Sequence, residues 1–281
     1  MLSRIQRSRK NERRVAILGA GPSGLLAAQA AYERGYEPVI FSRPPLGDRT
    51  GSVAKSELHG CQYLHAPVPS PSFAGGPGTP VNYTLRGTSD GYRQKVYGPD
   101  ARVAVSPDEY GNAEPHMAWD LRYVYAKLWA RWESKMRPIH VSPEEVQIAL
   151  NGPWARVLST VPAPSLCYDV AHKFTSQGIW AMGQREGSQD FPFACPPFTV
   201  VCNGERSTGF YRIANVFGMT TVEWPDGRKP PIKGVVRVEK PLDTDCTCHV
   251  KEGLVRLGRF GKWQKGVLVH TAYTETKVAL P

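Results

Sequence analysis

The feature that most constrains this chain is a glycine-rich turn between an apolar segment and an alanine-rich one. Residues 15–18 are a short apolar run, typical of a strand buried on both faces. The sequence GAGPSG follows at residues 19–24, and residues 25–34 continue as a predicted helix that Gly35 ends. A second apolar strand is predicted over residues 37–41. This order of strand, turn, helix and strand predicts a parallel α/β unit.

The glycine spacing is that of a turn that holds the diphosphate of a dinucleotide. Gly19 permits the tight turn, Gly21 lets the backbone approach a diphosphate, and Gly24 allows helix and strand to pack closely. The amino end of the helix directs unpaired N–H groups and a partial positive charge at the phosphates. We therefore expect a dinucleotide to bind all six residues of the turn: Gly19, Ala20, Gly21, Pro22, Ser23 and Gly24.

The end of the second predicted strand leaves the identity of the dinucleotide open. Ser42 stands where an acidic side chain usually holds a ribose, and a serine makes a weaker hydrogen bond there. Arg43 beside it could meet the 2′-phosphate of NADP, stack on an adenine, or lie in solvent. The turn alone therefore does not decide between FAD and NADP.

Two distant segments add to this pattern. Residues 155–164 are predicted as a strand that ends in STVPAP, and residues 255–278 as a strand, a Gly258-Arg259 turn and a closing helix. The inward face predicted for the last segment is Val267, Leu268, Thr271, Ala272 and Val278.

The ordered set of GAGPSG, STVPAP and GRFGKW resembles the FAD-dependent oxidoreductases of the glutathione-reductase-type superfamily. It is most similar to the branch that contains UDP-galactopyranose mutase and the amine oxidases, and to small flavoproteins predicted in actinobacterial phages. The resemblance implies an α/β fold: a Rossmann-like FAD/NAD(P)-binding domain with an inserted, mostly β substrate lobe.

The resemblance also implies roles for particular residues. The glycine turn would hold the ADP part of FAD, with Ser42 and Arg43 at its ribose and adenine. Thr160 and Pro162 would line the nucleotide, and Gly258 and Arg259 would close over the flavin or the diphosphate. Trp263 would cover the flavin ring. The candidates for catalysis, which follow the second framework strand, are Gln62, Tyr63 and His65.

The domain prediction follows the same framework. We expect a basic arm over residues 1–13 and an FAD-binding domain made of residues 14–60, 137–170 and 236–281. The substrate lobe would comprise residues 61–136 and 171–235. Within it we expect a hairpin formed by residues 81–86 and 92–97. A core-facing helix is predicted within residues 117–136, with Leu121, Val124, Tyr125, Leu128 and Trp132 on its buried face.

Charge and cysteine content limit the partners. The net charge of +10 could attract nucleic acid, but much of the excess lies in the N-terminal arm, where a solvated basic tail is the simpler interpretation. The chain shows no secretory signal and no long apolar run, so a cytoplasmic protein with reduced thiols is expected. Cys246-Thr-Cys248-His249 resembles half of a zinc site, but no second cysteine pair accompanies it, and no metal is predicted.

The sequence favours an FAD-dependent oxidoreductase that acts on a small molecule, and NADPH is a candidate for its reductant. Four different functions remain open beside it: an NADP-dependent reductase, a flavin enzyme acting on a nucleotide or modified nucleic-acid base, a non-redox flavin-dependent mutase, and a non-catalytic dinucleotide sensor. The parts of a hydrolase or kinase site, such as a nucleophile elbow or a P-loop lysine, are missing from the sequence.

Overall fold

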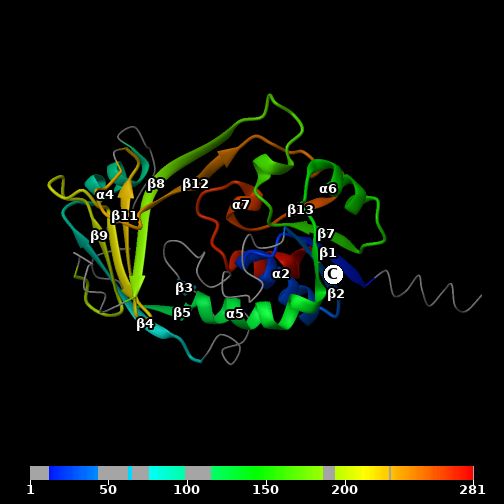
Figure 1. Ribbon diagram of the computed structural model, residues 1–281, viewed down its shortest axis with the longest axis horizontal. Coiled ribbons are helices and arrows are strands. Elements are labelled where there is room, and N and C mark those ends of the chain that lie inside the picture. Colours follow the sequence, from blue (N-terminus) through cyan, green and yellow to red (C-terminus); the bar gives the residue numbers. More distant parts are fainter. Residues whose placement is uncertain are drawn as a thin grey trace, which may run out of the picture.

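The described strands form two sheets, joined side by side along the long axis of the molecule (Figure 1). The computed structural model describes residues 13–43, 63–64, 76–98, 115–185, 194–227 and 229–280. Among the predictions above, residues 1–12 of the basic arm and the candidates Gln62 and His65 lie outside the described residues. A five-stranded sheet occupies the right side of the view and an eight-stranded sheet the left.

The five-stranded sheet is parallel throughout and has the strand order of a Rossmann domain. Its order is β13-β7-β1-β2-β6, so the chain builds outward from β1 on one side and then on the other. The strands are β1 (Arg14–Leu18), β2 (Glu37–Ser42), β6 (Met136–Pro138), β7 (Arg156–Ser159) and β13 (Leu254–Arg256). The order reverses between β1 and β7, and ligands of such sheets bind at the carboxyl ends of the strands beside this point.

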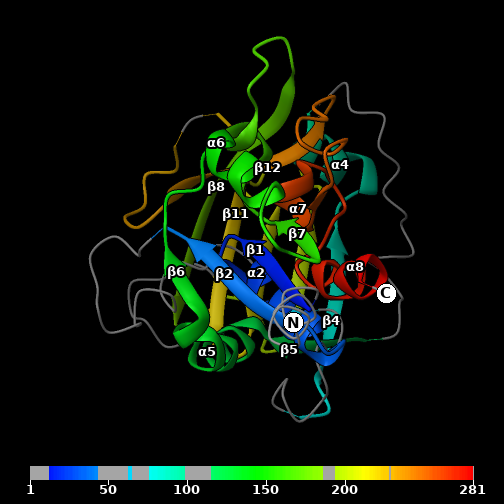
Figure 2. The same cartoon turned by 90° about the vertical axis from the view of Figure 1, so that its right-hand side faces the viewer.

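Three helices pack together on one face of this sheet (Figure 2). They are α2 (Pro22–Glu33), α5 (Leu121–Trp132) and α8 (Thr271–Ala279). Helix α2 is buried along almost its whole length, because its alanines let both neighbouring helices approach closely. The C-terminal helix is tied to it by Lys277, whose Nζ lies 2.8 Å from a carboxylate oxygen of Glu33, and by the hydroxyl of Tyr273, which donates to Glu33. The opposite face is covered by α6 (Pro143–Leu150) and the short helix η3 (Ala163–Leu166).

The eight-stranded sheet is mixed and has the order β12-β8-β11-β10-β9-β4-β5-β3. All of its pairs are antiparallel except that of β4 with β9. Its strands are β3 (Tyr63–Leu64), β4 (Thr79–Arg86), β5 (His116–Asp120), β8 (Phe174–Arg185), β9 (Thr199–Asn203), β10 (Arg212–Val216), β11 (Met219–Pro225) and β12 (Val236–Thr244). The prediction of an α/β framework with a mostly β lobe is therefore confirmed.

The predicted core helix is confirmed, whereas the predicted hairpin is wrong. All five apolar residues expected on the buried face of α5 are buried. Residues 92–97 belong to a helix, α4 (Ser89–Tyr97), rather than to a strand that pairs with β4. Thr88 caps this helix, since its Oγ1 accepts a hydrogen bond from the Gly91 nitrogen at 3.0 Å. The Thr-Ser-Asp-Gly sequence is thus a helix start, which resembles a turn when the sequence is considered alone.

The boundary between the two parts of the molecule differs from the prediction in two places. Strand β12, assigned from the sequence to the dinucleotide domain, pairs with β8 in the eight-stranded sheet. Helix α5, assigned to the lobe, packs on α2 beside the five-stranded sheet. The predicted inward face of the last segment is only partly correct, because Ala272 is buried but Val278 is 87% exposed.

Candidate functional site

Three segments that are far apart in the sequence meet at the carboxyl edge of the five-stranded sheet. Gly19 follows β1, Thr160 follows β7, and Gly258 lies two residues after β13. A Cβ atom at Gly19 would lie 2.6 Å from Oγ1 of Thr160, and one at Gly258 would lie 2.7 Å from Oγ of Ser23. The segments are therefore in direct contact, as the order of motifs predicts, and they surround the amino end of α2.

The glycines of this edge fall into two groups. Gly24 and Gly261 are needed for packing, because a Cβ atom would come within 1.9 Å of the Gly19 carbonyl oxygen or 2.6 Å of the Ser159 carbonyl oxygen. None of the described residues lies within 4 Å of the Cβ position of Gly21, and its φ is an ordinary −66°. Neither the backbone nor the packing of the described residues therefore requires a glycine at this position. It is also the N-cap of α2 and offers no side chain to cap the helix, so the amino end is open to an anion.

The remaining residues predicted at the nucleotide surround this turn. Oγ1 of Thr160 donates to the Leu18 carbonyl oxygen at 3.2 Å, and the Ala20 carbonyl oxygen accepts from the Tyr125 hydroxyl at 3.1 Å. These bonds hold the turn from both sides. Pro162 is exposed at the start of η3.

Ser42 and Arg43 lie at the carboxyl end of β2, on the same edge of the sheet as the glycine turn. Ser42 is half-buried and Arg43 is exposed. The Ser42 hydroxyl lies 3.4 Å from the carbonyl oxygen of Arg43. Both side chains are therefore at the edge where a ribose and an adenine would lie if the turn binds a dinucleotide.

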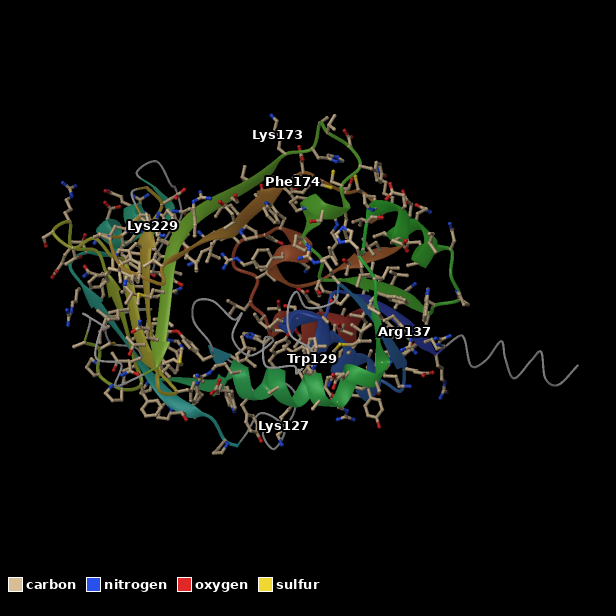
Figure 3. The ribbon with its side chains drawn as sticks, viewed as in Figure 1. Lys127, Trp129, Arg137, Lys173, Phe174 and Lys229 are labelled. Atoms are coloured by element: carbon tan, nitrogen blue, oxygen red, sulfur yellow. The ribbon has the colours of Figure 1, made fainter. Side chains whose placement is uncertain are left out.

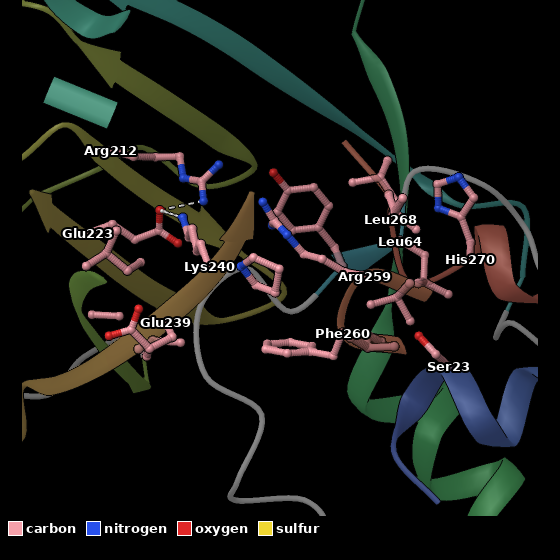
Figure 4. Close-up of a pocket in the computed structure, with 18 of the residues that line it drawn as sticks. Ser23, Leu64, Arg212, Glu223, Glu239, Lys240, Arg259, Phe260, Leu268 and His270 are labelled. Carbon is pink, nitrogen blue, oxygen red and sulfur yellow. Dashed lines mark hydrogen bonds and ion pairs between the residues drawn. The ribbon is translucent and has the colours of Figure 1, made fainter. Parts of the chain in front are cut away.

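A cavity of about 310 Å³ begins at Ser23 and extends between the two sheets (Figure 4). Its wall on the helix side comes from Ser23, Leu121 and the segment between α7 (Gly258–Lys262) and α8. Its opposite wall comes from β8, β11 and β12 of the eight-stranded sheet. Apolar side chains make up much of the lining: Leu64, Leu121, Ile179, Phe260, Val267 and Leu268. Such a cavity is large enough for a ring system and has a mainly apolar wall.

A buried carboxylate with two cationic partners lies at the β-lobe end of this cavity. Glu223 is 2% exposed, and its Oε2 lies 2.5 Å from an Arg212 nitrogen and 2.9 Å from Nζ of Lys240. The Tyr211 hydroxyl donates to the same oxygen at 2.6 Å. Burial works against ionisation of Glu223, but the two cations and these hydrogen bonds outweigh it and hold its pKa well below the usual value. Glu223 is therefore charged throughout the physiological pH range.

Arg259 extends from α7 into the cavity toward the strands that carry Glu223 and Lys240 (Figure 4). Burial lowers the pKa of its guanidinium, and its Nε has no hydrogen-bond partner among the described residues. Together with Arg212 and Lys240 it places three cations on the cavity, against the carboxylates of Glu223 and Glu239. The second carboxylate is also paired with Arg237, which lies outside the cavity lining. The cavity therefore favours a ligand with negative charge.

The candidates for proton transfer divide between described and undescribed residues. Tyr63 is buried in the cavity wall, where its hydroxyl is hydrogen-bonded to that of Tyr83. His270, which the sequence analysis did not select, also lines the cavity, and burial lowers its pKa. A neutral imidazole at that position can accept a proton at neutral pH.

Trp263 has a different environment from the one that the resemblance implies. Its Nε1 donates to the Thr175 carbonyl oxygen at 3.0 Å, and its ring packs edge-on against Phe174 and Phe260. It is not part of the cavity lining, whereas Phe260, three residues earlier, is. The structure therefore directs Trp263 against the start of β8, and Phe260 takes the position of an aromatic ring beside the cavity.

The charged group around Glu223 was missed because its members come from separate strands. One signal was present: Glu223 lies in a strand whose neighbours, from Thr220 to Trp224, are all buried. A carboxylate in such a strand needs a cationic partner, because an unpaired buried charge is costly. The identity of that partner could not be read from the sequence, since Arg212 and Lys240 pair with it only through the sheet.

The cysteine motif also differs from its sequence interpretation. Cys246 and Cys248 are accompanied by Cys167 and His172 from a loop elsewhere in the chain, and the four ligand atoms lie within 4.8 Å of one another. His249 is not among them, because its Nδ1 faces a carboxylate oxygen of Glu252 at 3.2 Å. The sequence analysis considered only neighbours in the sequence, so it did not bring Cys167 and His172 together with this motif.

The strand order and the glycine turn define a Rossmann-like α/β protein with a second, mostly β lobe. No protein-family model and no curated protein matches the chain. Among solved structures, it is similar in fold to a 2-methyl-3-hydroxypyridine-5-carboxylic acid oxygenase, with 12% identity over 95% of this chain and 86% of the other and a TM-score of 0.47.

Two further solved structures are similar at the same level. HpxO of Klebsiella pneumoniae, a single-residue variant complexed with FAD, has 9% identity over 95% of this chain and 85% of the other, with a TM-score of 0.45. CtdE in complex with FAD and a substrate has 12% identity, coverage of 95% and 79%, and a TM-score of 0.46. These scores and identities are low, so what this chain binds has to be inferred from its own residues. None of the described helices is both long and apolar enough to cross a membrane.

Proposed function

We propose that this chain is an FAD-dependent oxidoreductase that acts on a small, negatively charged molecule. The observation that carries the proposal is that no described residue lies within 4 Å of the Cβ position of Gly21, at the uncapped amino end of α2, where segments following β1, β7 and β13 meet. The conformation and packing of the described residues do not require a glycine at this position. A ligand that approaches the backbone closely explains why one is present.

The residues present fit the parts of FAD. The amides at the amino end of α2 would bind the diphosphate, and Ser42 would hydrogen-bond the ribose. The Nε of Arg259, which has no partner among the residues that the structure describes, supplies a donor to the diphosphate or to the flavin. The cavity beyond Ser23 accommodates a ring. When bound, the flavin supplies the acceptor and donor for electrons or hydride.

The chain's own side chains would bind and orient the substrate. Glu223 holds the side chains of Arg212 and Lys240 in place. Their positive charges are therefore preorganised at the far end of the cavity. The apolar side chains of Leu64, Leu121 and Leu268 exclude water from the middle. Among the described residues, two side chains of the cavity can exchange a proton with the substrate: Tyr63 through its phenol oxygen and His270 through an imidazole nitrogen.

An NADP-dependent reductase is the second candidate, and Arg43 is the observation that favours it. This arginine is exposed at the carboxyl end of β2, where a 2′-phosphate would lie. NADPH could also serve as a reductant of bound FAD. An enzyme of nucleotides or modified bases, a non-redox mutase and a non-catalytic sensor would all use the same dinucleotide site and differ only in the chemistry after binding.

The test is the visible absorption spectrum of the purified protein, recorded before and after addition of NADPH. The proposal predicts the spectrum of oxidised flavin, its bleaching by a reductant, and reoxidation by a substrate or by oxygen. A colourless protein that binds NADPH tightly would favour the reductase instead.

The variant that ties this spectrum to the site is Gly21→Asp. A carboxylate there meets the diphosphate, so the flavin should be lost, while the fold should persist because no described residue lies within 4 Å of the Cβ position. An unfolding transition like that of the wild type is the control for folding. Wild-type flavin content in this variant would contradict the proposal.

A further inference from the structure

We propose that Cys167, His172, Cys246 and Cys248 bind one zinc ion and form a closed structural site. The site is separate from the cavity, and it does not depend on the proposed flavin function. Cys167 and His172 lie in the loop between η3 and β8, and the two other cysteines lie in the loop between β12 and β13. Figure 3 shows this region of the chain near the labelled Lys173 and Phe174, at the start of β8.

Three of the six distances between the ligand atoms are those of a tetrahedral zinc centre, and none of the six exceeds 4.8 Å. A zinc ion with bonds of about 2.3 Å to sulfur and about 2.0 Å to nitrogen holds two sulfurs about 3.8 Å apart, and a sulfur and a nitrogen about 3.5 Å apart. The Sγ atoms of Cys167 and Cys248 are 3.7 Å apart, and Nδ1 of His172 lies 3.3 Å from the first and 3.5 Å from the second. Three thiolates and one imidazole are a ligand set that binds zinc in preference to calcium or magnesium.

The charge around the cluster supports a bound metal. Arg256 is only 9% exposed and donates to the carbonyl oxygens of Cys246 and Cys248, at 2.8 and 3.0 Å, and to Sγ of Cys246 at 3.3 Å. Among the described residues, no carboxylate pairs with this guanidinium. A buried cation without a counter-charge is costly. Three thiolates and a divalent ion carry a net charge of −1, which would neutralise it.

A carboxylate lies near the ring nitrogen of His172 that points away from the sulfurs. Nδ1 of His172 faces the sulfurs, while its Nε2 lies 3.8 Å from Oδ2 of Asp169. The other oxygen of Asp169 accepts from the Ala171 nitrogen at 2.9 Å, which holds the loop in this shape. In metal sites, the other N–H of a ligating imidazole is commonly directed at a carboxylate, and Asp169 lies on that side of the His172 ring.

The site would clamp the two lobes together. Strands β8 and β12 run side by side from the eight-stranded sheet toward the framework, and the two loops of the cluster begin at their framework ends (Figure 1). The loops already exchange two hydrogen bonds, from the Lys173 nitrogen to Asp245 and from Thr244 to the Lys173 carbonyl oxygen, both at 2.8 Å. All four positions of a tetrahedron are filled by protein, so the metal has no open position for a substrate.

The experiment measures zinc per chain in protein purified without chelators from zinc-supplemented cells, by mass spectrometry of the elements. We expect about one zinc per wild-type chain. In Cys248→Ser and His172→Asn, we expect the apparent zinc affinity to fall about 100-fold or more. Cys195→Ser and His249→Asn are the matched controls and should keep the metal, because Cys195 lies outside the cluster and His249 faces Glu252.

A second measurement uses only the wild type, so it does not depend on whether the variants fold. Removal of the metal with a zinc chelator should make three further thiols reactive toward a disulfide reagent, those of Cys167, Cys246 and Cys248. It should leave the flavin spectrum in place, which separates this proposal from the proposed function. A wild-type chain with no more than trace zinc, unchanged zinc in Cys248→Ser, or a disulfide within the cluster would overturn the proposal.

Discussion

The end of the cavity at α2 and the end at β11 and β12 are built in different ways. The first is made of backbone: a glycine turn, an uncapped helix and an open position at Gly21. The second is made of buried charges, with Glu223 held between Arg212 and Lys240. A backbone site needs small residues in a fixed local order, so it leaves a mark in the sequence. A charged site needs partners from several strands, so it appears only after folding.

The largest expected effect is at the charged end. Glu223→Gln leaves Arg212 and Lys240 without their buried carboxylate, and we expect it to lower the free energy of unfolding by about 3–5 kcal/mol. The measurement is urea unfolding at neutral pH. Glu239→Gln is the control, since this partly exposed carboxylate pairs with Arg237 at the surface and should cost less than about 1 kcal/mol. Equal, small effects would show that the buried group contributes no more than a surface pair.

The buried carboxylate of Glu223 also makes the free energy of unfolding depend on pH in the acid range. Because the folded-state pKa of Glu223 lies well below the ordinary value of 4.5, its stabilisation is complete above the pKa of the unfolded chain. It is lost as the pH falls from 4.5 through the folded-state pKa. The difference in unfolding free energy between wild type and Glu223→Gln should therefore narrow in acid. A difference that widens as the pH falls would be inconsistent with this assignment.

The next effect concerns the backbone end, where two glycines should behave oppositely. Gly24→Ala places a Cβ atom 1.9 Å from the Gly19 carbonyl oxygen, and we expect it to destabilise the fold by about 1–3 kcal/mol or more. Gly21→Ala meets no atom of the described residues within 4 Å and should lower the free energy of unfolding by no more than about 1 kcal/mol, the cost of alanine at an N-cap, while weakening FAD binding. Thermal unfolding and FAD titration of both variants test the contrast, which fails if Gly21→Ala is the less stable of the two.

A smaller effect is expected where the two ends meet, at Arg259. Arg259→Ala removes a desolvated cation whose Nε has no partner in the described part of the chain, so stability should stay the same or rise slightly. FAD affinity should fall about 10–100-fold, because a hydrogen bond to a charged group is lost. Fluorescence titration with FAD measures the affinity, and Arg206→Ala, at a site outside the cavity lining, is a surface control. Reduced stability with unchanged FAD affinity would assign Arg259 a structural role.

The smallest effect is expected at Trp263. Trp263→Phe removes the hydrogen bond to the Thr175 carbonyl oxygen and should cost about 1 kcal/mol of unfolding free energy, with no change in FAD affinity. Phe260→Ala, whose side chain lines the cavity, should instead change ligand binding. If Trp263→Phe weakens FAD binding more than Phe260→Ala does, the ring lies over the flavin as the resemblance implies.

These two regions also explain how much could be predicted from the sequence. Helix α2, the strands beside it and the buried face of α5 follow from local order and periodicity, and they were predicted correctly. The meeting of the three framework segments is implied by the resemblance, and it agrees with the rule that parallel strands end at one edge of a sheet. Each of the motifs that carry the resemblance lies within a few residues.

The errors concern features that depend on contacts between distant residues. The segment from Ser89 to Tyr97 folds as a helix whose Gly91 touches Gly204, and no local signal separates this start from a turn. Strand β12 lies in the lobe because β8 pairs with it. The cluster of Cys167, His172, Cys246 and Cys248 joins residues up to 81 positions apart, so the sequence shows only the half that lies in one loop.

Amide hydrogen exchange with and without FAD tests whether the three separated segments form one FAD site. We expect slower exchange on FAD addition in all three segments, residues 21–25, 159–163 and 257–262, and in the cavity wall that carries Tyr63 and His270. In Gly21→Asp the same addition should protect none of them. Protection confined to one segment, or located outside this edge of the sheet, would contradict the account.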